Sequence, residues 1–207
     1  MAVTRSANKS VSSAVASGAY AHAPSAFTLL WLAISLPLVA WDCGYVLMRP
    51  RTMEGGDLHW PIYLPYKLYG EIDYIYGWPA VHAGNGFTAG QGLLNVIETL
   101  MYMYYWVIYY QNAVSIGGTK KVVGRKAAIA VLVAFSAAVM TLSKTVLYWL
   151  CEYYSGYANI GHNSMQDLVF LWIIPNGAWL VAPTVMIYEL GGELVDHLAA
   201  GAGPKRD

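Results

Sequence analysis

The amino-acid sequence predicts an all-α integral membrane protein with four transmembrane helices and a long capping loop between the first two. Three observations predict this class. The chain of 207 residues is 57% hydrophobic, and its charged fraction of 12% is about half the share found in soluble domains. Its apolar residues gather in four stretches of about 20 residues, the length that crosses a bilayer as a helix. Most of its basic residues fall in alternate connections between these stretches.

The two ends of the chain are predicted to be tails that flank a membrane domain of residues 26–198. Residues 1–25 are rich in serine and alanine and lack the ordered regions of a signal peptide, so we expect a flexible N-terminal tail. Residues 199–207 form the predicted C-terminal tail. Cys43 and Cys151 both lie in apolar stretches, where we expect them to pack as small hydrophobic residues.

The predicted spans are residues 26–48, 90–113, 127–151 and 167–190. The loop between the first two spans has roughly 40 residues, which is long for a connection without structure of its own. Proline and glycine punctuate this loop, and its tyrosines and tryptophans fit the aromatic belt of a membrane interface. We therefore expect the loop to fold as a cap over one membrane face.

The basic residues predict the orientation of the spans. With four crossings, the N-terminal tail, the 114–126 loop and the C-terminal tail share one side of the membrane, and they hold eight of the twelve lysines and arginines. By the positive-inside rule, both termini are cytoplasmic. No block of basic residues indicates a nucleic-acid partner, so the lipid bilayer is the expected surroundings.

Three ionisable residues, Asp42, Glu98 and Lys144, lie inside predicted spans. A charged group at the centre of a bilayer costs about 2.5–3.5 kcal/mol on insertion scales, so each should face protein and be paired or neutralised. For Lys144 we weigh an ion pair with Glu152, with Asp42 or with Glu98.

The second predicted span carries a polar stripe. Gln91, Asn95, Glu98 and Tyr102 follow i, i+4, i+7, i+11 spacing, which places them on one face of a helix. Such a stripe must meet other protein or a water-filled cavity. Hydrogen bonding between helices would explain the two amides. It does not require a carboxylate, which makes Glu98 a functional candidate.

The other spans add aromatic and amide groups to the same interior. Lys144, Tyr148 and Glu152 follow i, i+4, i+8 spacing in the third span. In the fourth span, Pro175 is expected to kink the helix and to expose backbone carbonyls near Asn176. The predicted substrate-binding residues of the whole chain are Trp41, Tyr45, Asn95, Tyr102, Tyr148, Trp172, Asn176 and Trp179.

Carboxyl groups in an apolar, aromatic cavity suit proton transfer to an alkene. A low dielectric raises the pKa of a carboxyl group, so one acid of a pair can stay protonated and donate while the other accepts. Tryptophan and tyrosine faces would stabilise the carbocation between these two steps. We therefore predict Asp42 and Glu98 as catalytic residues. The sequence has no HExxH motif, cysteine cluster or glycine-rich phosphate loop, and we expect neither a metal nor a cofactor.

Three stretches resemble one family of membrane proteins. Residues 144–198, with the pattern N-x-x-W-L-x-x-P at 176–183, resemble the last third of the emopamil-binding protein family, the sterol Δ8–Δ7 isomerases. The stretch NVIETL resembles the second acidic segment of that family, and WDCGYVLMRP is closer to the related sigma-2 receptor branch, which has an aspartate here. Together these proteins form the EXPERA superfamily of four-helix endoplasmic reticulum membrane proteins. The likeness covers roughly residues 26–198.

The resemblance implies a sterol or related terpenoid at the centre of the bundle, with a proton added to the Δ8 double bond and another lost from C7. It matches Glu98 to the glutamate of the second helix and Asp42 to the position of the first-span glutamate. Asn176 and Trp179 would line the pocket, with Tyr148 beside them. The implied location is the endoplasmic reticulum membrane, and a homodimer is compatible with the fold.

One departure from the family keeps three functions open. The isomerases carry a histidine four residues before the first-span acid, where this chain has Leu38. We expect an isomerase that moves a C=C bond in a sterol or terpenoid, which is the family default. The alternatives are a non-catalytic sterol-binding or trafficking protein of sigma-2 type and a proton-initiated terpenoid cyclase. The missing histidine favours the alternatives, and the two acids with their aromatic surroundings favour the isomerase.

Overall fold

The computed structural model describes residues 19–201, and most of them are helical. The helices are α2 (Ala26–Leu47), α3 (Pro65–Ile72), α4 (Trp78–His82), α5 (Phe87–Asn112), α6 (Arg125–Tyr154), α7 (Met165–Asp167), the π-helix η1 (Leu168–Ile173) and α8 (Ile174–Gly201). The strands are β1 (Ala21–His22), β2 (Val114–Ile116) and β3 (Thr119–Val123). Residues 1–18 and 202–207 of the two predicted tails lie outside the described residues.

Among the described residues, three helical segments are long and apolar enough to cross a membrane: α2, α6 and the continuous run Met165–Gly201. The structure therefore supports an α-helical membrane protein. Helix α5 has 26 residues, but its two glutamines, two asparagines, one glutamate and five tyrosines lower its hydropathy, and it is not among the three. A fourth crossing, formed by α5, stays a prediction.

The chain divides into two compact units, and each of the four long helices contributes to both. Of the described residues, unit 1 comprises 19–33, 100–139 and 185–201. Unit 2 comprises residues 34–99 and 140–184.

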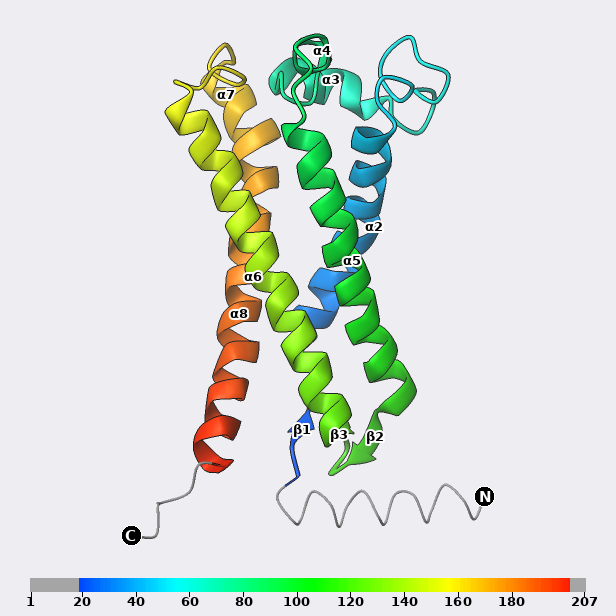
Figure 1. Cartoon of the computed structure of the whole chain (residues 1–207), viewed down its shortest axis with the longest axis vertical. Helices are drawn as coiled ribbons and strands as arrows, with labels where there is room; N and C mark the ends of the chain where they lie inside the picture. Colours follow the sequence, from blue (N-terminus) through cyan, green and yellow to red (C-terminus); the bar gives the residue numbers. More distant parts are fainter. Residues whose placement is uncertain (1–18, 202–207) are drawn as a thin grey trace. The chain divides into compact units, whose positions relative to one another are not determined.

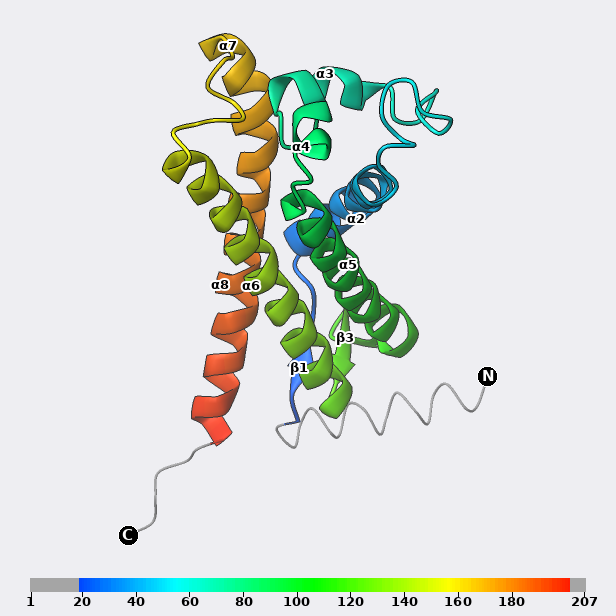
Figure 2. The same cartoon turned by 45° about the horizontal axis from the view of Figure 1, so that its top comes forward.

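Unit 1 contains a small sheet that the sequence did not predict. β3 lies in its centre and pairs antiparallel with β1 and β2, so that Ala21 faces Val123, and β1 runs beside β3 in Figure 2. Two residues of the predicted N-terminal tail, Ala21 and His22, thus form a strand of this sheet. His22 is 2% exposed. Its Nδ1 atom lies 2.8 Å from a carboxylate oxygen of Glu193, and its Nε2 atom lies 2.8 Å from the hydroxyl oxygen of Tyr105.

Small residues of α6 and α8 are packed tightly within unit 1. Ala127, Ala130 and Ala134 of α6 are fully buried. A Cβ atom at Gly191 of α8 would lie 3.0 Å from the ring of Phe135, which is tighter than ordinary packing allows. Such small-residue contacts are typical of helices that associate in a bilayer, where close backbone approach drives packing.

Unit 2 contains the loop between α2 and α5, which folds around α3 and α4 (Figure 1). Its tyrosines stack in the interior: the rings of Tyr66 and Tyr45 lie 3.7 Å apart and nearly parallel, and Tyr63 and Tyr66 are both buried. That the loop folds agrees with the prediction. Its position over a membrane face stays a prediction.

The predicted kink at Pro175 takes a different form. Six residues before α8 form the π-helix η1, and the N–H of Ile174 donates to the carbonyl of Val169. The side-chain amide of Asn176 donates to the carbonyl of Trp172 at 2.8 Å. Pro175 has no N–H to donate, and the residues before it form the wider turn of a π-helix, with the Asn176 side chain as an additional donor to the backbone. Helix α8 then continues to Gly201, three residues into the predicted C-terminal tail.

Candidate functional site

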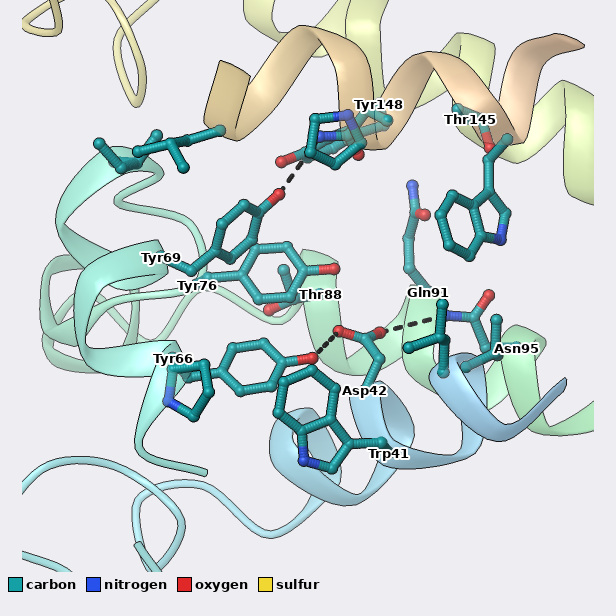
Figure 3. A pocket seen from close by; sticks show the side chains of 18 of the residues that line it. Trp41, Asp42, Tyr66, Tyr69, Tyr76, Thr88, Gln91, Asn95, Thr145 and Tyr148 are labelled. Atoms are coloured by element: carbon teal, nitrogen blue, oxygen red, sulfur yellow. Dashed lines mark hydrogen bonds between the residues drawn. The ribbon is translucent and has the colours of Figure 1, made fainter. Parts of the chain in front are cut away.

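Unit 2 holds a cavity of about 510 Å³, which is within the range of small-molecule pockets. Its walls come from α2, α3, α5, α6 and the η1–α8 segment. Most of its lining side chains are apolar or aromatic, and Asp42 and Lys144 supply its charged groups. Figure 3 shows the aromatic rings around the carboxylate of Asp42.

Asp42 is fixed on the cavity wall by two neighbours. Its Oδ1 atom accepts a hydrogen bond of 2.7 Å from the hydroxyl of Tyr66, and its Oδ2 atom accepts one of 3.5 Å from the side-chain amide of Asn95 (Figure 3). The ring of the adjacent Trp41 lies 4.7 Å from that of Tyr66. The Asp42 side chain is partly exposed and lines the cavity among aromatic rings. Its carboxyl group can therefore contact an apolar ligand that occupies the cavity.

Glu98 is buried in an ion pair and does not line the cavity. The Nζ atom of Lys144 lies 2.9 Å from both carboxylate oxygens of Glu98, and the hydroxyl of Thr141 donates to one of them at 2.8 Å. Lys144, which does line the cavity, also donates to the amide oxygen of Asn95. The predicted catalytic pair is therefore separated: Asp42 lines the cavity, whereas Glu98 does not line it and is paired with Lys144 of the cavity wall.

Of the partners weighed for Lys144, the structure selects Glu98. An ion pair with Glu152 is not formed, because Glu152 lies two turns further along α6 and is bound elsewhere. Its carboxylate accepts hydrogen bonds from the side-chain amide of Asn159 at 2.6 Å and from the Asn159 backbone N–H at 3.2 Å. Glu152 thus ties the end of α6 to the loop that follows it.

The α2–α5 loop supplies cavity residues that sequence reasoning assigned to an interfacial belt. Tyr66 and Tyr69 of α3 and Tyr76 beyond it all line the cavity. The hydroxyl of Tyr69 accepts a hydrogen bond of 3.2 Å from Asn176. Burial raises the pKa of the Tyr66 and Tyr69 phenols above the usual value, so both remain protonated donors at neutral pH.

Asp73 is the most notable residue that sequence reasoning missed. It is fully buried between α3 and α4, and it accepts hydrogen bonds from the hydroxyl of Tyr148, from the indole N–H of Trp172 at 2.9 Å and from the N–H of Ile75 at 3.1 Å. Burial raises the pKa of the Asp73 carboxyl group to about 6, although these donors oppose the shift. The available signal was an acid within the aromatic stretch IDYIY.

The structure brings most of the predicted substrate-binding residues to one cavity. The residues that line it are Trp41, Asn95, Tyr148, Asn176 and Trp179. Tyr45 and Trp172 are buried behind its wall, where they contact Tyr66 and Asp73. Tyr102 is buried in unit 1. Leu38, at the place of the family histidine, also lines the cavity.

Within residues 19–201, no group of three or more histidine, cysteine, aspartate or glutamate side chains is placed to hold a metal ion. A scan against family models, a search of curated proteins and a search of solved structures each found no match for this chain. The likeness to the emopamil-binding protein family therefore stays a prediction from the sequence.

Proposed function

We propose that this protein binds a sterol or a related terpenoid in the unit 2 cavity and moves a C=C bond by proton transfer from Asp42. One observation carries the proposal: the cavity is apolar and aromatic, and within residues 19–201 Asp42 is the single carboxylate that lines it. A membrane-dissolved ligand fits such a cavity, since three of the chain's helices are apolar enough to lie in a bilayer. The resemblance to the sterol isomerases supports the same ligand class and an endoplasmic reticulum location.

The arrangement suits a carbocation mechanism. The protonated carboxyl group of Asp42 donates its proton to one alkene carbon, and the adjacent carbon becomes cationic. The faces of Trp41, Tyr66 and Tyr76 stabilise that cation. Loss of a proton from the next carbon completes the new double bond, so the ligand is isomerised without a net change in atoms or electrons.

The ion pair of Glu98 with Lys144 has a role in this mechanism. An unpaired lysine on the cavity wall would repel a carbocation, and the 2.9 Å contact with Glu98 neutralises it. Asn95 links the two polar groups, because its amide donates to Asp42 and its oxygen accepts from Lys144. Glu98 is therefore proposed as a positioning residue that acts through Lys144, in place of the catalytic role expected from the sequence.

A second candidate function is binding without turnover. Leu38 lines the cavity where the isomerases have a histidine, so the cavity has one fewer proton-transfer group than theirs. In this case the carboxylate of Asp42 would anchor a hydroxyl or amine of the ligand. Proton-initiated cyclisation of a linear isoprenoid would use the same carboxyl group and the same aromatic faces.

A sterol profile tests the proposal. The protein and its Asp42→Asn variant are expressed in a yeast strain that lacks its own Δ8–Δ7 isomerase, with the exposed Asp57→Asn as the matched control. We expect the wild type and Asp57→Asn to convert Δ8 into Δ7 sterols and Asp42→Asn to leave Δ8 sterols unchanged. A well-expressed wild type that converts no Δ8 sterol contradicts sterol isomerisation. Saturable sterol binding would then favour the binding function, and turnover of a linear isoprenoid would favour the cyclase.

A further inference from the structure

We propose that Tyr148 is the second proton-transfer group of this site and that Asp73 receives the proton through it. The inference rests on the proposed function and completes it, since a shift of a double bond requires a proton acceptor as well as a donor. Neither Asp73 nor a relay through Tyr148 was expected from the sequence.

The geometry connects Asp73 to the cavity through a single side chain. Tyr148 of α6 lines the cavity, and its hydroxyl donates to the carboxylate of Asp73, which is fully buried and does not line it. The indole N–H of Trp172 lies 2.9 Å from Oδ2 of Asp73 and 3.2 Å from the hydroxyl oxygen of Tyr148. The N–H of Ile75 holds the other oxygen at 3.1 Å. The carboxylate is thus fixed, and its link to a ligand is the Tyr148 hydroxyl.

An acid at this position needs a reason beyond packing. The titratable groups that face Asp73 are Tyr148 and Glu152 of α6 and Tyr69 and Tyr76 of its own segment, and none of them is a cation. A buried carboxylate without a cation is costly even when both of its oxygens accept hydrogen bonds, as those of Asp73 do. Such groups cluster at sites that move protons. With its pKa raised to about 6, Asp73 is still ionised at neutral pH and can accept a proton.

Asp42 and Tyr148 occupy different walls of the cavity. Asp42 belongs to α2 and Tyr148 to α6, and Figure 3 shows the rings of Tyr69 and Tyr76 between them. A ligand in the cavity therefore meets a donor on one side and an acceptor on another. Two separate groups can serve two carbon atoms of the ligand, which a single carboxyl group reaches less readily.

The proton balance is as follows. Asp42 gives its carboxyl proton to one alkene carbon and becomes a carboxylate. The oxygen of Tyr148 takes a proton from the carbon beside the cation while its own hydroxyl proton passes to the carboxylate of Asp73, and the C–H electron pair becomes the new double bond. A phenol oxygen suffices as acceptor because a C–H bond next to a carbocation is strongly acidic. One proton has moved from Asp42 to Asp73, and exchange with water resets both groups between turnovers.

Steady-state kinetics across pH test the relay. Full-length protein in nanodiscs is assayed with a Δ8 sterol from about pH 4.5 to 8, a range that spans the pKa of Asp73. The variants are Asp73→Asn and Tyr148→Phe, and their controls are Asp57→Asn in the same loop and the exposed Tyr153→Phe on the same helix. In the wild type, kcat should rise with pH through about 6, because Asp73 must be ionised to accept the proton. Asp73→Asn and Tyr148→Phe should each lower kcat about 100-fold or more and abolish that rise, with KM close to that of the wild type.

The outcomes separate the relay from the proposed function. Asp73→Asn and Tyr148→Phe variants that keep both kcat and the rise near pH 6 overturn the relay alone and leave Asp42 as donor and acceptor. A wild type without turnover overturns the proposed function and the relay with it. If Asp73→Asn does not fold, Tyr148→Phe decides, because it removes one hydroxyl and leaves Asp73 bound to Trp172 and Ile75.

Discussion

At the scale of single residues, the polar groups of unit 2 divide into two sets. Asp42, Asn95, Lys144 and Glu98 form one connected network, in which Asn95 is the link. Asp73 belongs to a second set with Tyr148 and Trp172. Both sets reach the same cavity, and each is buried enough that removing one member leaves its partner without compensation.

The ion pair between Glu98 and Lys144 predicts strong coupling. Glu98→Gln should lower the free energy of unfolding by about 3–5 kcal/mol, because the buried Lys144 ammonium loses its counter-charge. Adding Lys144→Met should recover much of this loss. Thermal unfolding of the single and double variants in nanodiscs measures the coupling.

The control for these single and double variants is the exposed ion pair of Lys67 and Glu54 in the α2–α5 loop. Glu54→Gln should leave the unfolding transition unchanged, because water already solvates both groups. If the losses of stability caused by Glu98→Gln and by Lys144→Met simply add up in the double variant, the ion-pair role is contradicted.

Asp73 predicts a pH dependence of stability. Its pKa is raised to about 6 in the folded protein and is about 3.9 in an unfolded chain, so the folded state binds the proton more tightly. The protonated Asp73 therefore contributes about 3 kcal/mol to the free energy of unfolding. This contribution is fully present below about pH 4 and is lost as the pH rises through 6. Urea unfolding between pH 4 and 7 should show this loss in the wild type. Asp73→Asn should not show it, and a variant with the same pH profile as the wild type would disprove the assignment.

At the scale of elements, local backbone geometry decides features that hydrophobicity does not encode. The β2–β3 hairpin turns at Gly117 and Gly118, which have φ angles of 58° and 81°. The η1 segment widens the helix directly before Pro175 and places Trp172 against Asp73. The hairpin depends on two glycines with positive φ angles, and η1 on a six-residue π-helical run.

A glycine-to-alanine substitution should have opposite effects on stability in the hairpin and in helix α8. Gly118→Ala should lower the free energy of unfolding by about 1–2 kcal/mol, because a side chain disfavours the left-handed conformation. Gly192→Ala is the control: it lies inside α8 with open space around it, and it should raise stability by about 0.5–1 kcal/mol. Thermal unfolding of both variants checks the signs. Equal effects at the two positions would show that the turn conformation is not required.

At the scale of the whole molecule, the open question is whether α5 crosses the membrane. Within residues 19–201, three helical segments are long and apolar enough to supply three crossings. A fourth by α5 would place the 48–86 loop and the β2–β3 hairpin on opposite sides, with both termini on the side of the hairpin. The four basic residues between 120 and 126 favour the cytoplasmic side for the hairpin.

Accessibility mapping tests this topology. Cys43→Ala and Cys151→Ala give a background without native cysteines, into which Gly118→Cys in the hairpin or Gly55→Cys in the loop is introduced. In sealed microsomes, an impermeant thiol reagent should label position 118 and should reach position 55 only after the membrane is opened. Labelling of both positions in sealed vesicles would place α5 on one side of the membrane and reduce the crossings to three.

The sequence by itself determined the membrane class, the places of the long helices along the chain and one face of the site, although the last helix continues to Gly201, beyond its predicted end at 190. These features are local: an apolar run of sufficient length is helical in a bilayer wherever its partners lie. The i, i+4, i+7 stripe likewise put Asn95 and Glu98 on one helix face before any partner was known.

Only the tertiary structure decided which of these groups meet. The contacts of Asp42 with Tyr66, of Asp73 with Tyr148 and of Lys144 with Glu98 join residues 24, 75 and 46 positions apart. No periodicity within one helix encodes such pairings, because they depend on how the loop folds and how the helices pack. For the same reason, the sequence proposed Glu98 as a catalytic residue, whereas packing paired it with Lys144 and brought the loop residue Asp73 to the back of the cavity wall.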